Sequence, residues 1–133
     1  MAGPEVRMIG YHHVQLAMPP GPQAEADAVG FYEDLLGLTR ISKPEHLAAR
    51  GGCWFRSGPV ELHLGVEEPF APARKAHPAL LVEGLDSLER RLLAGGVAIE
   101  HDTQLEGHER FYVRDPFGNR LELLKRSITN ADG

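Results

Sequence analysis

Histidines and carboxylates recur at alternating positions in several short segments of this chain. In the segment 60–66, VELHLGV, apolar residues alternate with Glu61 and His63. Successive side chains of a β-strand point to opposite faces, so Glu61 and His63 would share one polar face of a strand. Imidazoles and carboxylates are the ligands that suit Zn²⁺, Ni²⁺, Mn²⁺ or Fe²⁺. The segment therefore predicts a strand whose polar face could contribute to a divalent metal site.

The same alternation in other segments enlarges this polar face. If the apolar side of every predicted strand packs inward, the opposite side collects a set of imidazoles, carboxylates, arginines and aromatic rings. The set comprises His13, Gln15, Trp54, Arg56, Glu61, His63, His77, Arg110, Tyr112, Arg120 and Glu122. The wet face of an amphipathic sheet is the plainer explanation, but such a face usually carries lysine, and this set contains none. The composition of the set favours metal binding without selecting individual ligands.

The elements that would position these side chains follow one order twice. In the first half the pattern predicts a strand ending at residue 18, a helix at 23–36, and strands at 38–42, 53–57 and 60–66. After a linker at 67–74, it predicts a strand at 77–82, a helix with Asp86 as N-cap, and strands at 97–101, 110–114 and 120–125. The chain is therefore expected to form one α+β domain over residues 1–133. It would contain two βαβββ modules, at about 7–66 and 75–126.

Composition and charge narrow the class of protein. The 133 residues are 42% hydrophobic and 25% charged, as in an ordinary globular domain. A formal net charge of -5 argues against nucleic-acid binding. No apolar run reaches the roughly 20 residues of a membrane span, and the N-terminus lacks the apolar segment of a signal peptide. The single cysteine, Cys53, cannot form an internal disulfide. We therefore expect a cytoplasmic protein that binds neither nucleic acid nor membranes.

Three strings resemble the vicinal oxygen chelate superfamily, which includes glyoxalase I, extradiol dioxygenases and the fosfomycin- and bleomycin-resistance proteins. They are HHVQLAM at 12–18, FYEDLLGL at 31–38 and DPFGNRLELL at 115–124. In spacing and type the resemblance extends from about Ile9 to Lys125. It implies that the two modules bend into a half-open mixed β-barrel, and that the protein is a homodimer. Modules could pair within one chain or between two chains.

The resemblance also implies one divalent metal ion and a set of ligands for it. The ligands would be His13, His77, Glu122 and Glu61. His63 lies two residues after Glu61 on the same side of its strand, so either residue could be the fourth ligand. Glu122 or Glu61 would also serve as the catalytic base.

Arginines and aromatic rings on the polar face suggest the chemistry of the substrate. Arg56 and Arg110 have the forked geometry that binds carboxylates or phosphates, and Trp54 and Tyr112 could form flat walls. With His63 they make up the expected substrate-binding set. We therefore predict a metal-dependent lyase, isomerase or dioxygenase acting on a small anionic substrate that chelates the metal. The alternative is a metal-free protein of the bleomycin-resistance type that sequesters its ligand.

Overall fold

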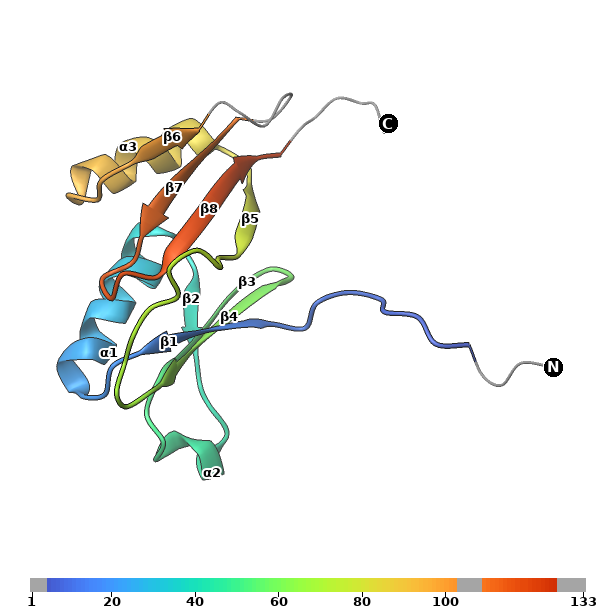
Figure 1. The fold of residues 1–133 in the computed structure, drawn as a ribbon, viewed down its shortest axis with the longest axis vertical. Coiled ribbons are helices and arrows are strands. Elements are labelled where there is room, and N and C mark those ends of the chain that lie inside the picture. The colour runs from blue at the N-terminus through green and yellow to red at the C-terminus, as the bar shows by residue number, and fades with distance from the viewer. Residues whose placement is uncertain (1–4, 103–108, 127–133) are drawn as a thin grey trace.

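The computed structural model describes residues 5–102 and 109–126, which form two four-stranded mixed sheets (Figure 1). The first sheet has the order β1-β4-β3-β2 and the second the order β5-β8-β7-β6. In each sheet the first two strands of that order are parallel and the other pairs are antiparallel. The strands are β1 (Val14–Met18), β2 (Thr39–Ile41), β3 (Cys53–Ser57), β4 (Val60–Val66), β5 (Ala79–Val82), β6 (Glu100–Asp102), β7 (Arg110–Arg114) and β8 (Arg120–Lys125). The predicted α+β class with two βαβββ-like modules is confirmed.

The helices differ from the sequence-based expectation in two details. The helix predicted at 23–36 consists of α1 (Pro22–Ala28) and a π-helical continuation, η1 (Val29–Leu35). Two further helices are α2 (Glu45–Ala48) and α3 (Leu85–Ala94). The N-cap of α3 is Gly84 in the left-handed conformation, so the assignment of Asp86 as N-cap was wrong. Asp86 instead lies in the first turn, where its charge complements the helix dipole. None of the helices in the described residues has the length and apolar character needed to cross a membrane.

Strand pairing places the predicted polar residues on one face of each sheet. In the first sheet Trp54 pairs with His63 and Arg56 pairs with Glu61. In the second, Tyr112 pairs with Glu122. Residues in register share a face, so the polar set divides into two groups, one on each sheet.

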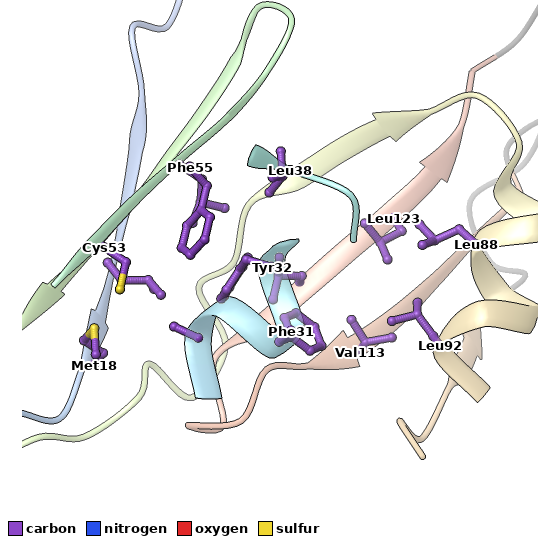
Figure 2. Close-up of a cluster of buried hydrophobic side chains, with 14 of the residues drawn as sticks. Met18, Phe31, Tyr32, Leu38, Cys53, Phe55, Leu88, Leu92, Val113 and Leu123 are labelled. Atoms are coloured by element: carbon purple, nitrogen blue, oxygen red, sulfur yellow. The ribbon is translucent and has the colours of Figure 1, made fainter. Parts of the chain in front are cut away.

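The apolar faces of the two sheets share a core with helix η1 between them. Figure 2 shows Phe31 and Tyr32 of η1 between Phe55 of the first sheet and Val113 and Leu123 of the second. All five side chains are at most 4% exposed. Both modules therefore bury their apolar faces against a common core, and their polar faces point away from it.

A buried hydrogen-bond network ties the second module to the first. The Tyr32 hydroxyl donates to Asp115 Oδ2 at 2.6 Å, and Asn119 Nδ2 donates to the same oxygen at 2.9 Å and to the Ala17 carbonyl at 2.8 Å. Asp115 Oδ1 accepts the backbone N–H groups of Phe117 and Asn119. Burial, together with the charge of Asp115, holds the pKa of Tyr32 well above its ordinary value. We call Tyr32, Asp115 and Asn119 the module latch.

Candidate metal centre

The polar face of the first sheet carries a stack of three rings. The His63 ring lies 4.0 Å from the Trp54 ring at an interplanar angle of 3°, and 4.1 Å from the His13 ring at 16°. His63 Nε2 is 2.8 Å from Glu61 Oε2. Burial lowers the pKa of His63, while the hydrogen bond with Glu61 opposes that shift. The ring of His63 is therefore enclosed on both sides and favoured in its neutral form.

The other groups on this face are more accessible. His13 is exposed, and its Nδ1 atom lies 2.9 Å from Nδ1 of His12. Arg56 Nε is 3.6 Å from Glu61 Oε1, and the Arg56 side chain is half exposed. The hydrogen bond from His63 is the main cause that lowers the pKa of Glu61. Glu61 is therefore favoured in its ionised form and lies next to the enclosed imidazole of His63.

The second sheet holds a histidine–carboxylate pair with a defined proton arrangement. His77 Nδ1 lies 2.7 Å from the Lys75 carbonyl oxygen, which can only accept, so this nitrogen carries a hydrogen. His77 Nε2 lies 2.9 Å from Glu122 Oε1. Histidines that bind metals typically donate the N–H of their outer ring nitrogen to a carbonyl or carboxylate, as Nδ1 of His77 does here. The pair therefore suits a cation bound at Nε2.

Glu122 is also held by an arginine. Arg110 Nη1 donates to Glu122 Oε2 at 2.9 Å, and Arg110 Nη2 donates to Asp102 Oδ2 at 3.0 Å. Burial alone would raise the pKa of Glu122, but the hydrogen bonds from His77 and Arg110 outweigh it and lower the pKa. Arg110 Nε is buried without a hydrogen-bond partner among the described residues. The two terminal nitrogens of the guanidinium thus each donate to a carboxylate.

Tyr112 lies at the centre of this second group. The His77 ring packs edge-on against it at 5.3 Å, and Arg120 Cζ lies 4.0 Å above its ring. In the described part of the chain Arg120 makes no ion pair. The sequence placed Arg120 on the polar face but did not select it as a site residue. Its position two residues before Glu122, on the same side of β8, was the available signal.

The predicted ligands form two pairs rather than one cluster. Within residues 5–102 and 109–126, no three His, Cys, Asp or Glu side chains are placed to hold a metal ion together. A cavity of about 970 Å³ between β1 and the segment entering β5 is lined by His13, Glu61 and His77. The donor types fit a divalent metal, but in the described residues the two pairs do not form one ligand cluster, although members of both line this cavity.

Comparison with known proteins agrees with this architecture. The chain belongs to the Glyoxalase/Bleomycin resistance protein/Dioxygenase superfamily, whose family model matches residues 11–123. The predicted family resemblance is therefore confirmed. No curated protein sequence matches the chain significantly.

Solved structures resemble the chain over nearly its whole length. A Bacillus anthracis protein assigned to the glyoxalase family is 42% identical, with a TM-score of 0.87, covering 92% of this chain and 99% of that one. The genomically encoded fosfomycin resistance protein FosX from Listeria monocytogenes is 14% identical, with a TM-score of 0.70, covering 92% and 97%. An integron cassette protein from V. cholerae is 23% identical, with a TM-score of 0.68, covering 92% and 99%. Similarity to the last two structures shows a shared fold only.

Proposed function

We propose that this protein is a metal-dependent enzyme, either a glyoxalase-like lyase or isomerase or a dioxygenase, that acts on a small anionic, oxygen-chelating substrate. The observation that carries the proposal is the geometry of His77, whose Nδ1 faces the Lys75 carbonyl while Nε2 faces Glu122. The likeness to the glyoxalase family protein from Bacillus anthracis supports the lyase or isomerase branch.

The proposed ligands of one divalent ion are His13, Glu61, His77 and Glu122. When bound, such an ion supplies Lewis acidity that stabilises negative charge on a substrate oxygen. His77 and Glu122 are already oriented by neighbouring groups, so little reorganisation is needed on the second sheet. His13 and Glu61 supply the remaining donors from the first sheet.

Different hydrogen-bond partners suggest different roles for the two carboxylates. A catalytic base loses its negative charge when it accepts a proton. Arg110 Nη1, 2.9 Å from Glu122 Oε2, stabilises that charge, which makes Glu122 better suited to remain a ligand. The arginine beside Glu61 is more distant, at 3.6 Å, and more exposed to solvent. The close partner of Glu61 is the imidazole of His63, which is favoured in its neutral form, whereas that of Glu122 is a charged guanidinium, so we assign Glu61 as the base.

The anionic part of the substrate would contact arginines near the metal. Arg120 is available to contact the substrate, because its guanidinium stacks on Tyr112 and makes no ion pair within the described residues. Arg56, half exposed beside Glu61, could approach from the first sheet. Arg110 would act through Glu122, and Trp54 would present the face of its indole that His63 does not cover.

A complete ligand set would need a second copy of the chain. The shared core and the module latch hold both apolar faces inward, which opposes any movement that would turn the two polar faces toward each other. Among the residues that the structure describes, no strand pairs with the outer edge of β1 or of β5. In a homodimer, His13 and Glu61 of one chain would meet His77 and Glu122 of its partner.

Exposed apolar side chains support such a dimer. The segment before β1 extends away from both sheets (Figure 1), and its Val6, Met8, Ile9 and Tyr11 are 84–94% exposed. Leu81 on β5 is 66% exposed. Contact with a second chain would remove this apolar surface from water.

The cavity between β1 and β5 favours one alternative function. Its volume of about 970 Å³ would accommodate a small organic ligand, and its ligand pairs remain separate within one chain. A metal-free protein that sequesters its ligand would use this cavity directly.

Metal content separates the two functions. We expect untagged wild-type protein to contain about one equivalent of a first-row metal per chain, and a His77→Ala/Glu122→Ala variant to contain almost none, because two ligands are removed. Plasma mass spectrometry measures both. Wild-type protein that remains metal-free after incubation with Zn²⁺, Ni²⁺ and Fe²⁺ would contradict the enzyme proposal and favour the sequestering protein.

A further inference from the structure

We infer that His63 is a positioning residue, which fixes His13 and Glu61 together and is itself held in place by Trp54. The inference rests on the proposed metal-dependent function and resolves which neighbour on β4 is the ligand. His63 contacts both proposed ligands of the first sheet, His13 through its ring face and Glu61 through Nε2.

The surroundings of His63 leave it little opportunity to bind metal or substrate directly. One ring face is covered by the Trp54 indole and the other by the His13 ring, and the residue is only 4% exposed. Glu61, by contrast, is more exposed and has a second carboxylate oxygen toward Arg56. The ligand role therefore falls on Glu61, and the orienting role on His63.

His63 orients the two ligands through two separate contacts. Parallel stacking restricts the tilt of the His13 ring, which lies just before β1 and is otherwise exposed. The hydrogen bond at 2.8 Å restricts rotation of the Glu61 carboxylate. Groups that orient metal ligands typically change metal affinity by 10- to 100-fold when removed. Loss of one contact should therefore weaken metal binding less than loss of both.

Variants at His63 can separate the two contacts. His63→Phe keeps a ring for stacking but removes the hydrogen bond, His63→Gln keeps a donor but removes the ring, and His63→Leu removes both. Calorimetric titration with Zn²⁺ should give a dissociation constant raised about tenfold in the first two variants and about 100-fold in His63→Leu. His101→Phe is the matched control, because His101 also pairs with a glutamate and packs on an aromatic ring, but on β6. Its affinity for Zn²⁺ should be unchanged.

The fluorescence of Trp54 provides a second readout. A change in its emission on Zn²⁺ binding would not depend on His63 if His63 served only to stabilise the fold. It is the only tryptophan in the chain, and its ring stacks on His63, which in turn stacks on His13. Zn²⁺ does not quench fluorescence itself, so a change in Trp54 emission on binding would report movement of the stack. We expect that change in wild type and in His63→Phe, and its loss in His63→Leu. Trp54→Leu, which uncovers one face of His63, should also weaken Zn²⁺ binding measured by calorimetry.

The outcomes distinguish this inference from the proposed function. Wild-type protein that binds no metal would contradict both. Wild-type protein that binds Zn²⁺ with the same affinity and emission change as folded His63→Leu would overturn the positioning role alone. Circular dichroism establishes that each variant is folded, and Trp54→Leu, at a more exposed position, provides the test if His63→Leu does not fold.

Discussion

Replacing Asp115 with alanine is expected to lower the free energy of unfolding by about 3 to 5 kcal/mol. The carboxylate accepts four hydrogen bonds, from the Tyr32 hydroxyl, the Asn119 amide and two backbone N–H groups. Asp115, Tyr32 and Asn119 are all at most 5% exposed, so water cannot readily replace the lost acceptor. Removing it would leave buried donors unpaired and would loosen the connection between the modules. Urea denaturation followed by circular dichroism, at one fixed protein concentration, measures the change.

Two companion variants test whether the module latch is the cause. Tyr32→Phe removes one hydrogen bond and retains the ring, so a loss of about 1 to 2 kcal/mol is expected. Asp34→Ala alters an exposed aspartate in η1, and stability should change by less than about 0.5 kcal/mol. Equal stability of Asp115→Ala and Asp34→Ala would show that the module latch contributes nothing measurable.

Alternation and helical periodicity predicted the order of the elements and the polar residues of each strand, and the family resemblance predicted how the two modules form one fold. Strands β3, β4, β7 and β8 occupy the predicted ranges, because each has period-two alternation bounded by Gly or Pro turns. The observed bounds of the other elements differ from the predicted ranges for local reasons. At the start of α3, for example, Gly84 can adopt a left-handed conformation, and it therefore caps the helix ahead of Asp86.

Partners of the polar side chains could not be predicted in the same way. Alternation places Arg110 and Arg120 on one face, but it does not indicate that Arg110 is held by Glu122 and Asp102 while Arg120 lies on Tyr112. Those contacts depend on lateral strand order and side-chain length. Likewise, the resemblance to the vicinal oxygen chelate superfamily implied one ligand cluster. In the described residues the two ligand pairs do not form one cluster, and that outcome depends on tertiary packing, which alternation does not indicate.

Mixing two metal-deficient variants is expected to restore metal binding if the ligands come from two chains. His13→Ala lacks a ligand of the first module, and Glu122→Ala lacks one of the second. In a mixed dimer both defects fall in one of the two sites, and the other site has every ligand. Random pairing makes half of the dimers mixed, so about a quarter of an equivalent of metal per chain should return. Subunits can be exchanged by unfolding and refolding the mixture, with metal measured by plasma mass spectrometry.

A second mixture provides the matched control. His77→Ala and Glu122→Ala both alter the second module, so each site of their mixed dimer lacks one ligand, and no metal should return. A site formed within one chain, by approach of β1 to β5 across the cavity that His13, Glu61 and His77 line, predicts a different pattern. In that case every chain in the first mixture would carry a defective site, and neither mixture would regain metal. Recovery confined to the first mixture would therefore assign the two ligand pairs to opposite chains, as expected if the module latch keeps the polar faces of one chain apart.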